Sequence, residues 1–149
     1  MSRSRSRIRS TACLVPLAVL TACSNATGSL LPEQIILEHR AVWEGQGLTS
    51  YSYTYEFWAF NRLAGQPLQL EVRADTVRSV MVVATGEVVD PRYFPTINSL
   101  FERALAAARD GSLTTVTFDG ERGYPTSIRY AAIPDALSSQ RASALQPLP

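Results

Sequence analysis

The sequence has no lysine, a single histidine and two cysteines. His39 is the only imidazole, and the cysteines, Cys13 and Cys23, both lie in the first 23 residues. The rest of the chain therefore offers no His and Cys set for a transition metal, which leaves only an all-carboxylate metal site open. It also offers no disulfide, so we expect the fold to depend on a hydrophobic core.

Signatures of common enzyme classes are missing as well. No glycine-rich phosphate loop follows a predicted strand, there is no Gly-x-Ser-x-Gly, and a Ser-x-x-Lys motif is impossible without lysine. Acidic residues suited to acid–base chemistry occur in predicted loops, but their spacing singles out no pair: Asp90, Asp119, Glu121 and Asp135. We expect a protein that is not an enzyme and uses no cofactor. The alternative is a small hydrolytic enzyme that uses loop carboxylates.

Basic residues are concentrated at the N-terminus. All 14 of them are arginines and four lie in the first ten positions, which leaves ten against 13 acidic residues. The remaining chain is mildly acidic and contains no basic block. Nucleic acid is therefore not an expected partner.

The N-terminus has the order of a secretory signal peptide. Arg3, Arg5, Arg7 and Arg9 precede an apolar run at residues 12–20. That order predicts a signal peptide over residues 1–22. The run is about half of the roughly 20 apolar residues that a membrane-spanning helix needs, so we do not expect a transmembrane anchor.

The end of this segment, Leu20-Thr21-Ala22-Cys23, resembles the lipobox of bacterial lipoproteins. The resemblance implies cleavage before Cys23 and acylation of its thiol, with residues 23–31 as a lipidated tether. Two or three acyl chains hold a protein stably on a membrane. We therefore expect an extracytoplasmic, membrane-anchored lipoprotein, on the outer membrane of a Gram-negative host or on the outer face of the cell membrane otherwise. The alternative is an ordinary cleaved signal with an incidental cysteine.

Residues 32–133 are predicted to form a single α+β domain. Pro32 suits a first helical turn, and Gly45 ends that helix. Thr96 is a good N-cap for a second helix that ends before Gly111. The apolar stripe of the first helix consists of Ile35, Ile36, His39, Val42 and Trp43, and that of the second of Ile97, Leu100, Phe101, Ala104, Leu105 and Ala108.

Period-two alternation predicts five strands, at residues 50–60, 68–73, 77–84, 113–118 and 126–132. The order is α-β-β-β-α-β-β. Short connections favour an antiparallel sheet, and two amphipathic helices need one of its faces, so we expect a two-layer sandwich. Residues 134–149 are polar, small and proline-bearing, and are expected to be a loose C-terminal tail.

The first strand, SYSYTYEFWAF, presents two different faces. Tyr51, Tyr53 and Tyr55 alternate and are expected to be core. Trp58 and Phe60 fall on the opposite, polar face, where large aromatics next to arginine indicate a contact site. The predicted partner-binding patch consists of Trp58, Phe60, Arg73, Arg78 and Arg129. The alternative is a bulge after Phe57 that turns Trp58 back over the core.

Several short motifs together resemble a family of bacterial secreted proteins and lipoproteins, domain of unknown function number 6174. The resemblance covers residues 35–130 and includes Trp43, Gly47-Leu48, Ser50-Tyr51-x-Tyr53, Leu100-Phe101, Phe118-Asp119 and Gly123-Tyr124-Pro125. Many members carry a Cys-x-Cys near the end of the first strand, where this chain has Phe-Trp-Ala-Phe. The resemblance implies the domain limits and the lipoprotein context, and no activity.

These observations favour a lipid-anchored, non-enzymatic domain that binds a protein, a peptide or a component of the envelope. Membrane contact is expected through the lipid on Cys23. A purely structural envelope protein is the third possibility.

Overall fold

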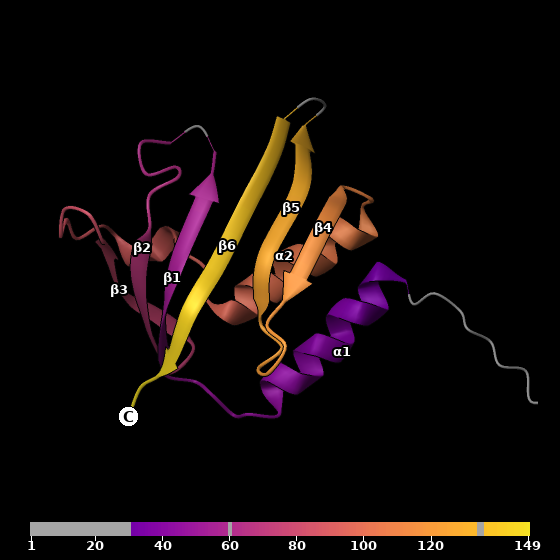
Figure 1. Cartoon of the computed structure of the whole chain (residues 1–149), viewed down its shortest axis with the longest axis horizontal. Helices are drawn as coiled ribbons and strands as arrows, with labels where there is room; N and C mark the ends of the chain where they lie inside the picture. The colour runs from indigo at the N-terminus through magenta and orange to yellow at the C-terminus, as the bar shows by residue number, and fades with distance from the viewer. Residues whose placement is uncertain (1–30, 60, 134–135) are drawn as a thin grey trace, which may run out of the picture.

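The computed structural model describes residues 31–59, 61–133 and 136–149 (Figure 1). The signal peptide, Cys23 and most of the tether lie outside the described residues, as do Phe60 and Asp135. The elements in chain order are α1 (Pro32–Glu44), β1 (Tyr51–Trp58), β2 (Leu68–Arg73), β3 (Thr76–Val82), the short 3-10 helix η1 (Pro91–Tyr93), α2 (Ile97–Arg109), β4 (Leu113–Phe118), β5 (Pro125–Ile133) and β6 (Ala136–Pro147).

All strands belong to one antiparallel sheet with the order β3-β2-β1-β6-β5-β4. The chain runs outward from β1 to the β3 edge, crosses through α2 to the β4 edge, and returns so that its last strand enters the centre (Figure 1). The predicted α+β class and antiparallel sheet are confirmed. The number of strands is six and not five.

The expectation of a loose C-terminal tail is wrong for residues 136–147, which form β6. This strand pairs with β1 on one side and with β5 on the other. Its sequence, ALSSQRASALQP, lacks the bulky alternating side chains that mark a strand, and it buries Gln140, Ala142 and Leu145. A central position supplies two main-chain hydrogen-bond ladders, and these stabilise a strand whose side chains give little signal.

The helices lie on one side of the sheet, with α2 running behind the strands in Figure 1. The predicted stripe of α2 is confirmed, with Ile97, Leu100 and Phe101 at most 1% exposed. In α1 the buried stripe is narrower than expected. Ile36 and Trp43 are buried, whereas Ile35 and Val42 are 36% and 51% exposed. The reason is that α1 packs against α2 and the ends of strands, and does not lie flat on the sheet.

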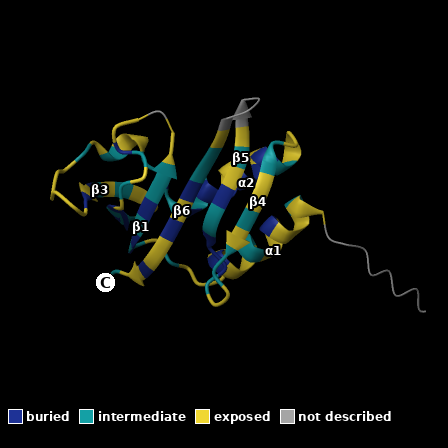
Figure 2. Cartoon of the chain, turned by 45° about the horizontal axis from the view of Figure 1, so that its top comes forward, coloured by how far each residue is buried: buried dark blue, intermediate teal, exposed yellow. Residues whose placement is uncertain are grey.

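The tyrosine row of β1 is core, as predicted. Tyr51 and Tyr53 are fully buried, Tyr55 is 3% exposed, and buried and less buried residues alternate along the strands (Figure 2). The Tyr51 hydroxyl accepts a hydrogen bond of 2.9 Å from the backbone N–H of Ile97, and the Tyr53 hydroxyl donates to the Pro95 carbonyl. These bonds satisfy backbone groups at the start of α2 and attach that helix to the sheet.

Candidate functional site

Trp58 is the last residue of β1 and lies on the sheet face opposite the helices. Its register partner is Ser139 of β6, whose other neighbour is Arg129 of β5. The pairing continues without a shift from Phe57 to Trp58, so the alternation is confirmed and there is no bulge here. The Trp58 side chain is 43% exposed.

A shallow hollow of about 330 Å³ surrounds this tryptophan. We call the residues that line it the Trp58 patch: Trp58, Arg129, Leu137, Ser138, Ser139 and Arg141. The Arg141 guanidinium carbon lies 5.8 Å from the centroid of the indole ring, within cation–π range. Leu137 is 69% exposed, so the patch joins apolar surface to positive charge.

The structure divides the predicted patch. Trp58 and Arg129 come together, whereas Arg73 and Arg78 lie elsewhere. Because β1 and β2 are antiparallel, Arg73 lies beside the start of β1, seven residues from Trp58, or about 23 Å at ~3.3 Å per residue. Arg73 is engaged by Glu71 at 2.8 Å and by the Pro149 carbonyl at 2.7 Å. Arg78 is exposed on the edge strand β3.

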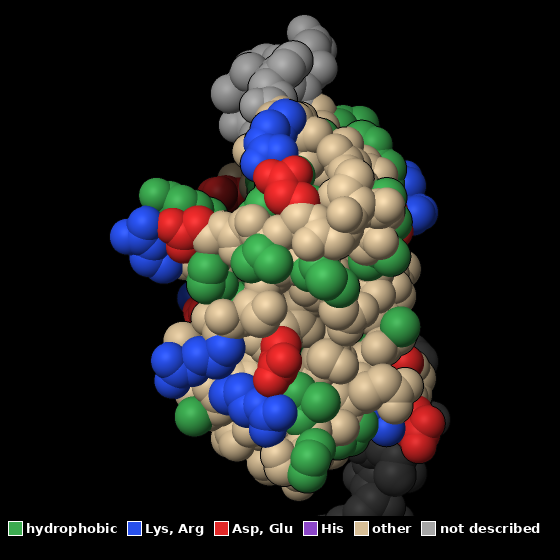
Figure 3. Space-filling view, turned by 90° about the vertical axis from the view of Figure 1, so that its left-hand side faces the viewer, with side chains coloured by type: hydrophobic (Ala, Val, Ile, Leu, Met, Phe, Trp, Pro, Cys, Tyr) green, Lys and Arg blue, Asp and Glu red, His purple; other side chains and the backbone are tan. Residues whose placement is uncertain are grey.

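Charge at the Trp58 patch is not neutralised. Among the described residues neither Arg129 nor Arg141 takes part in a salt bridge. Glu56 is opposite Arg141 in the ladder, but the two form no ion pair. By contrast, charges of both signs and apolar side chains are interspersed on the surface at the β3 edge (Figure 3). Among the described residues, the Trp58 patch therefore presents two arginines without an ion pair beside an exposed aromatic ring, with Glu56 across the ladder from Arg141.

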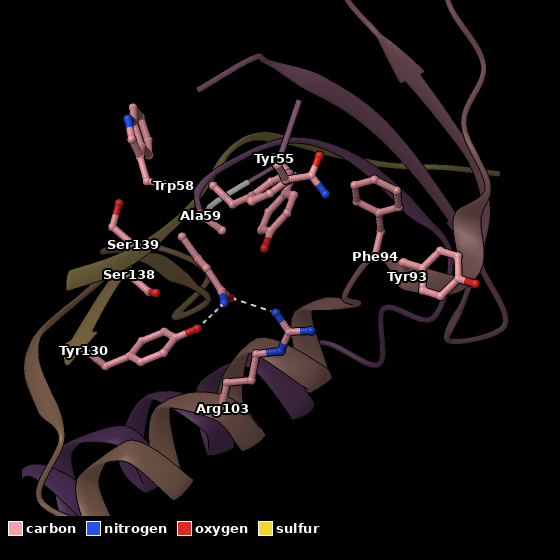
Figure 4. Close-up of a pocket in the computed structure, with 12 residues that line it drawn as sticks. Tyr55, Trp58, Ala59, Tyr93, Phe94, Arg103, Tyr130, Ser138 and Ser139 are labelled. Atoms are coloured by element: carbon pink, nitrogen blue, oxygen red, sulfur yellow. Dashed lines mark hydrogen bonds between the residues drawn. The ribbon is translucent and has the colours of Figure 1, made fainter. Parts of the chain in front are cut away.

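A second hollow opens at the same end of the sheet, on the helix side (Figure 4). It has a volume of about 240 Å³, and we call it the aromatic pocket. The wall of this pocket is built from β1, the connection that follows it, β5, β6, α2 and the segment around η1. It consists of Tyr55, Phe57, Trp58, Ala59, Asn61, Tyr93, Phe94, Arg103, Tyr130, Ser138, Ser139 and Gln140. Among the described residues, this lining contains one cation and no acidic residue.

The polar groups of the aromatic pocket form a connected network. Gln140, which is 6% exposed, accepts a 3.1 Å hydrogen bond from Arg103 through its Oε1 and donates a 3.0 Å bond from its Nε2 to the Tyr130 hydroxyl (Figure 4). The hydroxyl of Tyr55 points toward the Arg103 guanidinium. Burial raises the pKa of Tyr55 to about 12, although Arg103 opposes the rise, so the phenol is protonated at neutral pH.

Of the loop acids considered for a hydrolytic enzyme, Asp135 lies outside the described residues, and Asp90 and Asp119 are each engaged by neighbouring groups of their own loops. Asp90 accepts hydrogen bonds from the backbone and guanidinium of Arg92, and these lower the pKa of its carboxyl group. Asp119 accepts from the backbone N–H groups of Glu121 and Arg122 in the β4–β5 turn. Across the described ranges, no three His, Cys, Asp or Glu side chains group closely enough to hold a metal ion.

His39 is stacked on Phe118, with ring centroids 4.0 Å apart and ring planes at 6°. The imidazole therefore contributes to packing between α1 and β4.

A comparison with protein families decides where the chain belongs. The model of a family of unknown function, DUF6174, matches residues 36–136, well over half of the sequence. The chain belongs to this family. The match confirms the resemblance seen in the sequence motifs, and it ends at the first residue of β6.

Neither a curated protein nor a solved structure matches the chain. Within the described residues, no helix has the length and apolar character required to cross a membrane.

Sequence reasoning missed Arg141, Arg103 and Gln140. Arg141 and Gln140 belong to β6, which was expected to be tail, so neither had a predicted face. Arg103 lies on the polar side of α2, and its sequence context gives no sign that its guanidinium reaches the end of the sheet. The alternation of β1 was sufficient to find Trp58.

Proposed function

We propose that this chain is a lipid-anchored extracytoplasmic domain that binds an acidic segment of another envelope protein through the Trp58 patch. One observation carries the proposal: a 43% exposed tryptophan lies beside two arginines that have no salt bridge among the described residues, on the face away from the helices. Trp and Arg are the residues that most often dominate the energy of protein contacts.

Charge complementarity favours an acidic partner. A carboxylate can pair with Arg129 or Arg141 while apolar atoms of the same segment pack on Trp58 and Leu137. Because the patch is shallow and exposed to water, its ion pairs are screened by salt. Binding should therefore weaken as the ionic strength rises.

The membrane anchor is supported by the sequence. The signal-like segment ends in Leu20-Thr21-Ala22-Cys23, and about eight residues separate this cysteine from the start of α1 at Pro32. A spacer of this length would separate the lipid on the cysteine from the first helix. Anchoring also raises the effective concentration of the domain toward other proteins on the same surface.

The anchor is tested by intact-mass analysis and cell fractionation of the wild-type chain and a Cys23→Ser variant. The expected result is a lipid-modified wild-type protein in the membrane fraction and an unmodified, released variant. A wild-type protein that is released and carries no acyl chain would contradict the anchor.

The patch is tested by capture from crosslinked envelopes with Trp58→Ala, and with Tyr93→Ala as the matched control. Tyr93 is also an exposed aromatic, at 76%, but lies outside the Trp58 patch. We expect Trp58→Ala to remain folded and to lose a salt-sensitive acidic partner that Tyr93→Ala retains. Equal capture by both variants would contradict this role for the patch, as would a Trp58→Ala protein that unfolds.

A further inference from the structure

The aromatic pocket has hydrogen-bond donors that converge on its interior. Arg103 is an exposed residue of α2 whose guanidinium, which can only donate, forms a 3.1 Å hydrogen bond with Gln140 at the pocket. The Gln140 amide must therefore turn its oxygen to Arg103 and its NH₂ group to Tyr130. Since the Tyr130 oxygen accepts from Gln140, the proton of that hydroxyl is left to donate to another group.

Tyr55 adds a third donor. Its hydroxyl faces the donor-only guanidinium of Arg103, so its own proton is also free to point into the pocket (Figure 4). Arg103, Tyr55 and Tyr130 come from α2, β1 and β5, and all three line the same 240 Å³ space. A ligand group that accepts several hydrogen bonds and donates none fits this arrangement.

The charge of the lining selects an anion over a cation. Among the described lining residues Arg103 is the one charged side chain, and it forms no salt bridge with any described residue. Aromatic walls alone would suit a quaternary ammonium group, but such a ligand would meet the guanidinium with no carboxylate to balance it. An ionised carboxylate matches the fork of an arginine and accepts from the two phenols.

The remaining walls are aromatic, so they favour a ligand whose anionic group is attached to an apolar part. Tyr55 and Phe57 stack at 5.8 Å, and Phe94 meets each of them edge to face at 6.4 and 6.5 Å. The volume of about 240 Å³ admits a single ring or a short chain. Flat rings pack well on such walls in offset or edge-to-face geometry.

We propose that the aromatic pocket is a binding site for a small organic monocarboxylate with a compact aromatic body. The carboxylate lies against Arg103, Tyr55 and Tyr130, and the ring lies among Tyr55, Phe57 and Phe94. The buried Gln140 amide is a positioning residue, because it holds Arg103 and Tyr130 in place. This site opens on the helix side of the sheet. It shares Trp58, Ser138 and Ser139 with the Trp58 patch, but none of the side chains assigned to the ligand belongs to that patch.

The test is equilibrium dialysis of radiolabelled benzoate against the full chain purified in detergent, with micelles alone as the blank. Benzamide, which has the same shape without the charge, is the matched probe. We expect saturable binding of benzoate, at least tenfold weaker binding of benzamide, and a loss of about 10- to 100-fold in benzoate affinity in Arg103→Gln. Tyr55→Phe and Tyr130→Phe should each weaken binding by a smaller factor, because each removes one donor and keeps the ring.

Two controls locate the binding site. Arg129→Gln removes a cation of the Trp58 patch and should leave benzoate binding unchanged. Arg109→Gln removes a cation of α2 that pairs with Glu33 outside the pocket, and it should also leave benzoate binding unchanged. Urea unfolding of each variant shows whether it is folded. A folded wild-type chain that binds no benzoate would overturn the proposal. Equal binding by Arg103→Gln, or equal binding of benzamide, would also overturn it.

Discussion

Replacing Tyr53 tests whether the tyrosine row is the structural centre of the domain. The side chain is fully buried, and its hydroxyl donates to the carbonyl of Pro95, which is itself buried. Tyr53→Phe keeps the ring and leaves that carbonyl without its partner, which costs about 1–3 kcal/mol. Tyr53→Ala also creates a cavity, and truncation of a large aromatic costs about 3–5 kcal/mol, so we expect a combined loss of about 4–8 kcal/mol.

The assay is urea unfolding followed by the fluorescence of Trp43, which is 2% exposed and packs edge to face on Tyr51. With a slope of about 1–3 kcal/mol per molar urea, Tyr53→Phe should lower the midpoint by roughly 1 M. Tyr53→Ala should remove much of a total stability of about 5–15 kcal/mol. Tyr93→Ala is the control, because that tyrosine is 76% exposed and its loss should change stability by less than about 0.5 kcal/mol.

The reasoning would be refuted if Tyr53→Ala unfolded at the same urea concentration as Tyr93→Ala. That result would mean that the tyrosine row faces solvent and does not hold the start of α2. If Tyr53→Phe were as unstable as Tyr53→Ala, the loss of stability could not be divided into one part from the hydrogen bond and a larger part from the buried ring.

Three further predictions concern the rest of the fold. A chain that ends at Ile133 lacks β6, so it should show no cooperative unfolding transition by circular dichroism; a sharp transition would contradict the central place of that strand. Gly123→Ala should destabilise the domain by more than about 1 kcal/mol, because φ at Gly123 is +76° and a Cβ there would lie 2.7 Å from the His39 carbonyl oxygen. Gly120→Ala is the control, since a Cβ at Gly120 meets nothing within 4 Å. Equal midpoints of urea unfolding for the two variants would contradict this prediction. Tyr55 has its pKa raised from 10.0 to about 12, so its stabilising contribution is complete below pH 10 and is lost as the pH rises from 10 to about 12. Urea titrations across this range should show that the free energy of unfolding falls by about 2–3 kcal/mol less in Tyr55→Phe than in the wild-type chain. An equal fall in both proteins would contradict this prediction.

The two helices and the first five strands were predictable because their signals are local. Alternating tyrosines identify β1, and the Thr96 hydroxyl accepts from the Ser99 N–H at 3.1 Å, as its position before an apolar stripe indicates. The sixth strand has no comparable signal. Its stability comes from pairing with β5, the strand directly before it, and with β1, which is distant in the sequence, and its small polar side chains are equally compatible with a loop.

The candidate sites were predictable only where they depend on one strand. Trp58 follows from the alternation of β1, and Arg129 from that of β5. Arg141 and Gln140 required β6. Arg73 was placed in the patch by its sheet face alone, although antiparallel pairing of the first two strands puts the end of the second beside the start of the first, far from Trp58. The aromatic pocket lies between α2 and the ends of three strands, so the sequence pattern of no single element predicts it.

The most direct measurement for the proposed partner contact is photocrosslinking in intact cells with benzoylphenylalanine in place of Leu137. This residue is 69% exposed in the Trp58 patch, and Met81, 39% exposed on the edge strand β3, is the control position. The account predicts an adduct from position 137 to an acidic envelope protein, lost on Trp58→Ala and at high salt, and not formed from position 81. Absence of an adduct at 137, or the same adduct from both positions, would contradict it.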